Sequence, residues 1–280
     1  DPGSLIVYTQ SSMLPGGWLG TEVDAAAEGT HRSLAPGDLN RDGHEDLVTV
    51  FVPQGGSAGE LRVHLSSGTI PPSFSTIPVA PSQAEGGQVV FDLDRDGRAD
   101  IVTPTGYYRQ IAPTSFAFVP FPLVGSDRGL GVAIASLNGD FEPDVVVHTT
   151  ILTGANQRAT GYRLVGLAAD GLGSFVPTVI DSLDRSLDPT CIGDCYPETN
   201  IAATNLNTVT AADLDHDGDD DVVLSEDQGL KIYETQAGGY TPAGSFGDLR
   251  WSESVALDAG GDGVLDLVVA ATPQSAILAI

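Results

Sequence analysis

Short runs of apolar residues, most of them β-branched, recur along the chain, and five of them begin at an aspartate. They are DLVTV from Asp46, DIVTP from Asp100, DVVVH from Asp144, DVVLS from Asp221 and DLVVA from Asp266. Other short apolar segments, such as QVVFDL, GVAIASL and TVTAADL, precede three of these runs. Because β-branched residues favour strands and runs of this length are short for helices, the pattern predicts pairs of strands joined by the polar residues between them.

The polar connections share one nine-residue pattern of the type D-x-[DN]-x-D-G-x-x-D, which occurs five times in frame. We name the copies loop one to loop five, and they cover residues 38–46, 92–100, 136–144, 213–221 and 258–266. One acidic turn with a glycine is a weak signal, because such turns are common on protein surfaces. Five copies that are each followed by the same kind of strand indicate an internal structural repeat.

The spacing within the loops is typical of a site for a hard cation. A tight loop can turn the side chains at positions 1, 3, 5 and 9 inward, and position 7 can add a backbone carbonyl. The glycine at position 6, present as Gly43, Gly97, Gly218 and Gly263, permits the positive φ that such a turn requires. Calcium suits a flexible site of oxygen ligands better than magnesium, and the absence of His or Cys ligands disfavours zinc.

The sequence therefore predicts Ca²⁺ bound by the acidic loops. The predicted metal ligands are Asp38, Asn40, Asp42, His44 and Asp46; Asp92, Asp94, Asp96, Arg98 and Asp100; Ser136, Asn138, Asp140 and Asp144; Asp213, Asp215, Asp217, Asp219 and Asp221; and Asp258, Asp262 and Asp266. Loops one, two and four are well formed. Loop three has Ser136 at position 1 and Phe141 at position 6, and loop five has Gly260 at position 3, so we expect three good sites and two weak or empty ones.

The loops differ from an EF-hand, which needs a glutamate at position 12 and flanking helices. Position 12 is occupied here by Thr49, Thr103, Val147, Leu224 and Val269. The chain instead resembles the FG-GAP and VCBS repeat proteins, which include the propeller of integrin alpha subunits and secreted bacterial homologues. The FG and GAP signatures are faint, as in GSF from Gly173 and from Gly244. The resemblance implies an all-β propeller in which each calcium loop links the first two strands of a four-stranded blade.

The spacing of the loops sets the expected number of blades. Their starts are 54, 44, 77 and 45 residues apart, and a blade of four strands takes about 40 to 50 residues. Residues 258–280 together with residues 1–37 would supply one further blade, which gives about five. Segments from Ser4 and from Ser275 both resemble a third strand, so membership of a six- to eight-bladed ring stays open.

We expect residues 1–280 to form a single domain. The long interval between loops three and four contains strands near Val145, Tyr162 and Phe175 and then a polar insertion over residues 184–205. The insertion contains Cys191 and Cys195, which are expected to form a small disulfide and to indicate an oxidising compartment. The apolar run over residues 264–280 is expected to form two strands, not a membrane anchor. Residues 1–4 lack the pattern of a secretion signal, so the sequence is expected to be that of a mature or trimmed chain.

The charge of the chain limits its partners. Its 38 acidic and 12 basic residues give a formal net charge of −26, which repels nucleic acids and anionic membrane surfaces. Haloadaptation is an alternative explanation, since Lys231 is the only lysine, but it would scatter the carboxylates along the chain. We find 20 of the 38 acidic residues within the five loops and the four residues after each, so the charge is expected to supply metal ligands.

No catalytic motif of the G-x-S-x-G, H-E-x-x-H or phosphate-loop type is present, and we expect the chain not to be an enzyme. The histidines are scattered, at positions 31, 44, 64, 148 and 216. The favoured function is an extracellular, calcium-stabilised module for adhesion or for binding glycan or protein. Aromatic residues that are candidates for this contact, or alternatively for packing between blades, are Trp18, Tyr107, Tyr108, Tyr196 and Trp251.

Two other functions stay open. A calcium-dependent carbohydrate-active enzyme such as a polysaccharide lyase would need a base and a cationic group, but Arg109 and Arg128 each lack a basic neighbour in the sequence. A structural subunit of a surface assembly would use the insertion at residues 184–205 and the chain ends for contacts with other chains.

Overall fold

A computed structural model describes residues 4–10, 17–24, 29–54, 59–82, 87–123, 128–140, 142–153, 158–170, 174–184, 209–226, 229–236, 239–247, 253–270 and 277–279. Within these ranges all regular elements are strands, so the chain is all-β as predicted. No described segment forms a helix long and apolar enough to cross a membrane.

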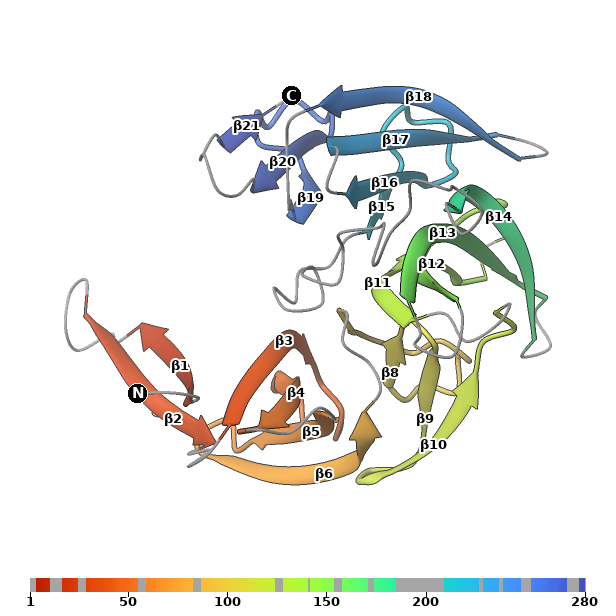
Figure 1. The fold of residues 1–280 in the computed structure, drawn as a ribbon. Helices are drawn as coiled ribbons and strands as arrows, with labels where there is room; N and C mark the ends of the chain where they lie inside the picture. Colours follow the sequence, from red (N-terminus) through yellow and green to blue (C-terminus); the bar gives the residue numbers. More distant parts are fainter. Residues whose placement is uncertain are drawn as a thin grey trace.

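Four sheets have four antiparallel strands each, in sequence order. They consist of β3 (Gly29–Gly37), β4 (Asp46–Pro53), β5 (Gly59–Ser66) and β6 (Phe74–Ser82); β7 (Val89–Phe91), β8 (Asp100–Thr103), β9 (Gly106–Ala112) and β10 (Ser115–Pro120); β11 (Arg128–Ala135), β12 (Asp144–Thr153), β13 (Arg158–Ala169) and β14 (Phe175–Asp184); and β15 (Val209–Ala212), β16 (Asp221–Glu226), β17 (Gly229–Gln236) and β18 (Gly239–Gly247). The sheets follow one another around an open arc (Figure 1).

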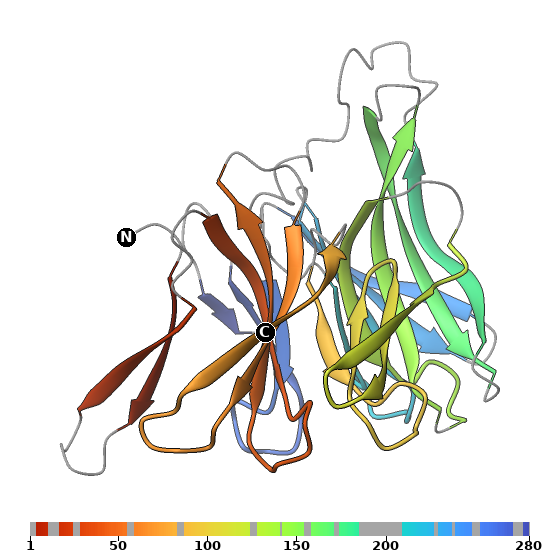
Figure 2. The ribbon, with the colours of Figure 1, turned by 90° about the horizontal axis from the view of Figure 1, so that it is seen from below.

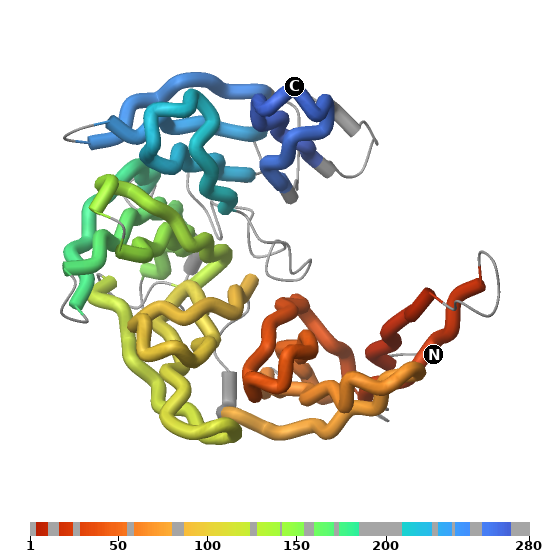
Figure 3. Tube along the Cα trace, turned by 180° about the vertical axis from the view of Figure 1, so that it is seen from behind, coloured from red at the N-terminus to blue at the C-terminus, as the bar shows by residue number. Residues whose placement is uncertain are grey.

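Smaller sheets lie at the two ends of the arc. One pairs β1 (Leu5–Gln10) with β2 (Trp18–Asp24), and the other contains β19 (Glu253–Leu257), β20 (Asp266–Ala270) and β21 (Ile277–Ala279). Among the described residues, no sheet combines strands of residues 258–280 with strands of residues 1–37, so the joint blade predicted from these two segments is not shown. Seen from behind, the trace also leaves the two ends of the arc apart (Figure 3).

Each acidic loop links the first two strands of its sheet, as the sequence predicted. The aspartate at position 9 is the first residue of the second strand, as Asp46 is in β4 and Asp144 in β12. Immediately after it the strands are buried on both faces: Val145, Val146 and Val147 are fully buried. Strands of this kind read as continuous apolar runs.

The hydrophobic core lies between neighbouring sheets. One cluster joins Val50 and Leu61 of the β3–β6 sheet to Ile101 and Tyr108 of the next sheet. Similar clusters join the β7–β10 sheet to the β11–β14 sheet, that sheet to the β15–β18 sheet, and the β15–β18 sheet to the β19–β21 sheet. Figure 2 shows these sheets from below, with their long strands standing side by side.

The insertion predicted over residues 184–205, with Cys191 and Cys195, lies outside the described residues apart from Asp184 at the end of β14. Tyr196 and Trp251 lie outside them as well. The predicted disulfide therefore stays a prediction.

Candidate metal centres in the acidic loops

The backbone of the loops turns sharply at two positions. The glycines at position 6 have φ between +80° and +99°, as predicted. Position 4 also has positive φ, and three of its residues are not glycine: Arg41 at 62°, Arg95 at 55° and His216 at 64°. The left-handed region is unfavourable for such side chains, so the rest of the loop must hold them there.

Side-chain oxygens inside each loop accept backbone N–H groups in a regular order. In loop two, Asp94 Oδ1 at position 3 accepts the N–H of Asp96 at 3.2 Å, and Asp96 Oδ1 accepts the N–H of Arg98 at 2.9 Å. The same two contacts recur in loops one, three and four. Each carboxylate or amide that makes one contact keeps a second polar atom for other partners.

The aspartate at position 9 has a structural role that the sequence analysis did not predict. Asp100 Oδ2 accepts the N–H of Leu93 at 3.1 Å, and Asp100 Oδ1 accepts the N–H of Gln110 at 2.8 Å. Asp46, Asp144 and Asp221 make the corresponding pair of contacts, and all four residues are at most 1% exposed. This aspartate therefore joins its loop to the third strand of the same sheet.

Burial also changes the acidity of these groups. It raises the pKa of Asp100 to about 6, and the nearby charges of Asp94 and Asp96 add to this against the opposing hydrogen bonds from Gln110 and Leu93. Burial raises the pKa of Asp46, Asp144 and Asp221 as well. A cation beside the loop would favour the ionised form of these carboxyls.

Loops two and four bring three carboxylates together. Oxygens of Asp92, Asp94 and Asp100 lie within 4.8 Å of one another, and so do oxygens of Asp213, Asp215 and Asp217. Each position-1 residue uses one oxygen as a hydrogen-bond acceptor within the loop: Asp92 Oδ2 accepts the N–H of Gly97, and Asp213 Oδ2 accepts that of Gly218. Their other oxygen, Oδ1, is buried and has no hydrogen-bond partner.

These two buried oxygens are a direct test of whether the loops suit a cation. A buried, unpaired carboxylate oxygen is costly, so it needs a charged partner that the protein itself does not provide. Carboxylate oxygens are the ligands that Ca²⁺ prefers, and the donors here fit it. The residues at positions 1, 3 and 9 of loop two and at positions 1, 3 and 5 of loop four are therefore candidate ligands.

The two loops differ in their counter-charges. In loop two, Arg109 Nε of β9 lies 2.5 Å from Asp94 Oδ2, and Arg98 Nη1 lies 3.3 Å from Asp96 Oδ2. In the described part of the chain, no lysine or arginine forms an ion pair with Asp213, Asp215 or Asp217. Loop four therefore has the stronger need for a cation.

Loops one and three have an asparagine at position 3. Asn40 Nδ2 donates to Asp42 Oδ2, and Asn138 Nδ2 donates to Asp140 Oδ2, both at 3.0 Å. In loop one both oxygens of Asp38 already accept N–H groups, those of Asp42 and Gly43. Both loops thus satisfy more of their own carboxylate oxygens than loops two and four do.

Loop five differs most from the other loops in the hydrogen bonds of its position-1 aspartate. Asp258 Oδ1 accepts the N–H groups of Gly261 and Asp262, and its Oδ2 accepts that of Gly263. Gly260 at position 3 has no side chain to receive the N–H of Asp262, so Asp258 is the acceptor of this N–H, whereas in loop one Asp38 and Asn40 both accept the N–H of Asp42. These contacts lower the pKa of Asp258 while the group stays fully exposed.

Known proteins resemble parts of this arrangement. Residues 38–103, from position 1 of loop one to the last residue of β8, match the FG-GAP-like repeat. The chain contains an FG-GAP-like repeat. Among curated proteins, no sequence matches the chain.

The solved structures that resemble most of the chain include a lectin and a biofilm matrix protein. One is a lectin of Agrocybe aegerita described as specifically recognising non-reducing terminal N-acetylglucosamine, with 17% identity and a TM-score of 0.48, covering 86% of this chain and 60% of that one. The other is the V. cholerae biofilm matrix protein Bap1, with 18% identity and a TM-score of 0.49, covering 98% of this chain and 39% of that one. The chain thus spans less than two thirds of either protein.

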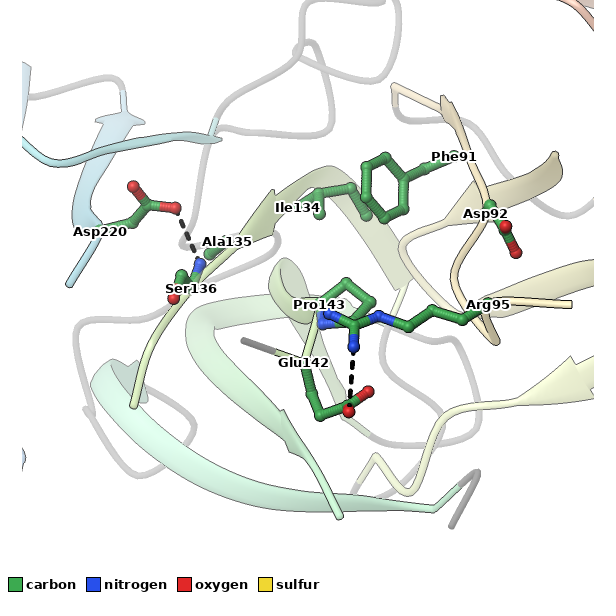
Figure 4. A pocket seen from close by; sticks show the side chains of 9 residues that line it. All are labelled: Phe91, Asp92, Arg95, Ile134, Ala135, Ser136, Glu142, Pro143 and Asp220. Atoms are coloured by element: carbon green, nitrogen blue, oxygen red, sulfur yellow. Dashed lines mark hydrogen bonds and ion pairs between the residues drawn. The ribbon is translucent and has the colours of Figure 1, made fainter. Parts of the chain in front are cut away.

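A pocket lies where loops two, three and four meet, and its lining residues Phe91, Asp92 and Arg95 belong to the FG-GAP-like repeat. It is lined by Phe91, Asp92, Arg95, Ile134, Ala135, Ser136, Glu142, Pro143 and Asp220 (Figure 4). Arg95 Nη1 and Glu142 Oε1 form an ion pair of 3.1 Å between loops two and three. Asp220 Oδ2 accepts the N–H of Ser136 and so joins loop four to loop three. Phe91 is 39% exposed here, and the sequence analysis did not single it out.

The aromatic residues predicted as candidates for ligand contact include both buried and exposed side chains. Tyr107 and Tyr108 are 4% and 9% exposed and pack in the core between sheets, which was the alternative reading of these residues. Trp18 is 62% exposed on β2. Of the described candidates from the sequence, only Trp18 presents its ring to solvent.

The histidines are not all scattered, which corrects the sequence analysis. His31 and His64 lie with their ring centroids 5.7 Å apart, and Asp24 joins them in a third group whose ligand atoms lie within 4.8 Å of one another. Burial lowers the pKa of His31 and lowers that of His64 to about 4. Strand pairing brings these residues together, so sequence distance gave no sign of it.

A second polar group connects two sheets around the single lysine. Lys231 Nζ of β17 donates to Tyr162 Oη at 2.6 Å and lies 3.2 Å from Asp181 Oδ2, while both Tyr162 and Tyr233 donate to Asp181. Burial alone would raise the pKa of Asp181, but the two tyrosine hydroxyls and Lys231 outweigh it and lower the pKa. With Tyr162 1% and Tyr233 4% exposed, the group acts as an internal contact between sheets.

Proposed function

We propose that residues 1–280 form one extracellular β-propeller domain that binds Ca²⁺ through its acidic loops and uses the loop-bearing face to bind a glycan or a protein. The four-stranded antiparallel sheets would be its blades. The observation that carries the calcium proposal is the buried, unpaired Oδ1 atom of Asp92 and of Asp213, each within a group of three carboxylates. The match to the FG-GAP-like repeat supports it.

Calcium would act on structure, not on chemistry. Bound Ca²⁺ relieves repulsion between carboxylates and fixes the loop between the first two strands of a sheet. The ligand residues named from the sequence at positions 1, 3, 5, 7 and 9 of loops one to four are the proposed set, with the best sites at loops two and four. Because the proposed module is extracellular, we expect it to bind Ca²⁺ with a dissociation constant of about 10⁻⁴ to 10⁻³ M.

Calcium titration of the chelator-treated protein tests this directly. We expect at least two equivalents to bind by isothermal titration calorimetry, and Asp92→Ala and Asp213→Ala to remove one equivalent each. Asp258→Ala is the matched control and should leave the number unchanged, because Asp258 uses its oxygens within its own loop. Full stoichiometry in Asp213→Ala would contradict the proposal.

The pocket in Figure 4 is the proposed ligand site. Its partly exposed Phe91 ring offers a flat apolar surface of the kind that stacks on sugars, and the Arg95–Glu142 pair supplies hydrogen-bonding groups at its edge. Because loops two, three and four line the pocket, calcium at loops two and four would fix its shape.

Binding of the calcium-loaded protein to a glycan array, with a parallel pull-down from extracellular protein extracts, tests the site. Phe91→Ala should weaken any ligand found by about tenfold or more, as loss of a central aromatic contact does. Trp18→Ala removes an exposed aromatic on β2, outside the pocket, and should leave binding unchanged. The reverse result would move the ligand site to β2. Calcium stoichiometry should be normal in both variants, which separates this test from the metal proposal.

A further inference from the structure

The face of the β3–β6 sheet that lies toward β2 contains a row of polar side chains where apolar packing would be expected. His31 of β3, Thr49 of β4, and His64 of β5 are connected across three strands, and Thr76 of β6 extends the row. Thr49 and His64 are fully buried, and the side chain of His31 is 7% exposed. Asp24, the last residue of β2, reaches the row from the neighbouring sheet.

The ring nitrogens divide into two kinds. His31 Nδ1 lies 3.1 Å from Thr49 Oγ1, and His64 Nδ1 lies 2.9 Å from Thr76 Oγ1. His31 Nε2 is buried and has no hydrogen-bond partner. His64 Nε2 faces the shared hydroxyl of Thr49 at 2.9 Å. Each ring is therefore oriented through Nδ1, and Nε2 of His31 points into the group with its capacity unused.

The distances fit ligands of a common metal ion. His31 Nε2 lies 3.7 Å from Asp24 Oδ2, which is too long for a hydrogen bond. Two ligand atoms about 2.1 Å from one tetrahedral zinc ion lie about 3.4 Å apart. One ligand atom each from Asp24, His31 and His64 all lie within 4.8 Å of one another, so small side-chain movements would bring them around one ion.

We propose that Asp24, His31 and His64 form a second kind of metal site, which binds a divalent transition metal ion such as Zn²⁺ through two imidazole Nε2 atoms and one carboxylate. Two nitrogen ligands and one oxygen select this class of ion, because calcium prefers oxygen alone. The hydroxyls of Thr49 and Thr76 orient the rings from their outer side, as the outer-shell partners of metal-bound histidines do. The ion would replace the hydrogen bond between His64 Nε2 and Thr49 Oγ1, and water is available as a fourth ligand.

Arg62 is the main charge that opposes this site. Its Nη1 lies 2.8 Å from Asp24 Oδ2, but its Nε also lies 2.7 Å from Glu60 Oε2, and its guanidinium stacks on Phe51. Two carboxylates thus surround one guanidinium, and the group has a net charge of −1 with both imidazoles neutral. Arg62 would hold the Asp24 carboxylate in place while another of its lone pairs binds the ion.

The site would connect two sheets, in addition to the ion pair between Arg62 and Asp24. Asp24 lies on the β1–β2 sheet at the end of the arc, and both histidines lie on the β3–β6 sheet (Figure 1). An ion shared by the two would fix the end sheet, so we expect Zn²⁺ to raise the melting temperature in addition to the effect of Ca²⁺.

Zinc titration of the protein in saturating Ca²⁺, which occupies the acidic loops, tests the proposal. We expect one tight equivalent, and a weakening of more than about 100-fold in His31→Ala and His64→Ala, since even the loss of an outer-shell partner costs about 10- to 100-fold. Thr76→Val should weaken binding by about tenfold. His216→Ala, at an exposed loop position outside the proposed ligands, is the matched control and should bind normally.

A measurement on the unaltered chain covers the case in which the variants fail to fold. Addition of one equivalent of Zn²⁺ should shift the ring ¹⁵N resonances of His31 and His64 and leave those of His44 and His216 in place. Shifts confined to His44 and His216, or the absence of a tight equivalent in saturating Ca²⁺, would overturn the proposal. Loss of Ca²⁺ binding alone would affect the acidic loops and not this result.

Discussion

Loop four and loop five have the same length, and each joins the first two strands of its sheet, yet their carboxylates have different hydrogen-bond partners. In loop four, Asp213, Asp215 and Asp217 converge and leave a buried oxygen unpaired. In loop five, both oxygens of Asp258 accept hydrogen bonds from backbone N–H groups. The two loops differ at position 3, where Asp215 accepts the N–H of position 5 and Gly260 has no side chain to do so.

This contrast shows that a metal-binding loop must solve two problems with one set of oxygens. Its own N–H groups need acceptors, and the ion needs ligands. Loop four meets the first need with one oxygen of each side chain and keeps the others for the ion. Loop five has no side chain at position 3, and both oxygens of its position-1 carboxylate accept N–H groups of the loop itself.

The largest effect is expected at position 9, where the two loops should differ even without metal. Asp221 is 1% exposed and receives the N–H groups of Leu214 and Thr235, so Asp221→Ala leaves two donors unpaired in the interior. At about 1 to 3 kcal/mol for each, the free energy of unfolding should fall by about 2 to 6 kcal/mol. Asp266→Ala, at a more exposed site, should cost about 1 kcal/mol. Urea unfolding in EDTA measures both, and equal losses would contradict the assigned role.

Loop five should gain a calcium site when position 3 is restored. In Gly260→Asp the new carboxylate can accept the N–H of Asp262, which leaves Asp258 Oδ1 with the N–H of Gly261 alone and a lone pair for the ion. The nearest atom to a Cβ at position 260 is 3.7 Å away. One additional equivalent of Ca²⁺ should bind by calorimetry. At a concentration 100 times the dissociation constant, this should stabilise the fold by about 2.7 kcal/mol. Gly260→Ala adds a side chain without oxygen and serves as the control, with no added equivalent.

The repeat, the strands on either side of each loop and the order of the blade-like sheets could be predicted because each depends on local sequence. The apolar run after Asp144 and the glycine at position 6 carry their structural meaning in a few neighbouring residues. Contacts between distant strands could not be predicted in this way. Asp24, His31 and His64 meet only because β4 pairs with both β3 and β5 and the end of β2 reaches this sheet, and Phe91 lines a pocket formed by three separate loops.

The sheets around loop four should also make the protein sensitive to acid independently of calcium. Burial lowers the pKa of His148 on β12 to about 3, and Lys231 of β17 lowers it further against the opposing charge of Asp181 on β14. At His148 the unfolded chain therefore binds one more proton than the folded chain between pH about 3 and 6.5, so the stability that this group contributes should fall as pH falls through this window, by up to about 1.4 kcal/mol per unit. The raised pKa of buried carboxyls such as Asp100 acts in the opposite direction.

Urea unfolding in EDTA at several pH values measures this dependence. His148→Gln removes the titrating group, and its stability should vary less steeply with pH below 6.5, by up to one proton. His31 and His64 are also buried with lowered pKa and will retain part of the slope. An unchanged slope in His148→Gln would show that His148 does not contribute.

The smallest expected effect is a change in calcium affinity at loop two that does not occur at loop four. Arg109 Nε lies 2.5 Å from Asp94 Oδ2 and is 46% exposed, so it offsets part of the charge that a calcium ion would otherwise neutralise. A partly exposed ion pair contributes about 0.2 to 1 kcal/mol, and Arg109→Gln should therefore strengthen calcium binding at loop two by about 1.4- to 5-fold. Loop four has no such partner among the described residues, so its affinity should not change in this variant. Calorimetry on Arg109→Gln combined with Asp213→Ala isolates loop two, and a weaker affinity there would mean that Arg109 holds Asp94 in position for the ion.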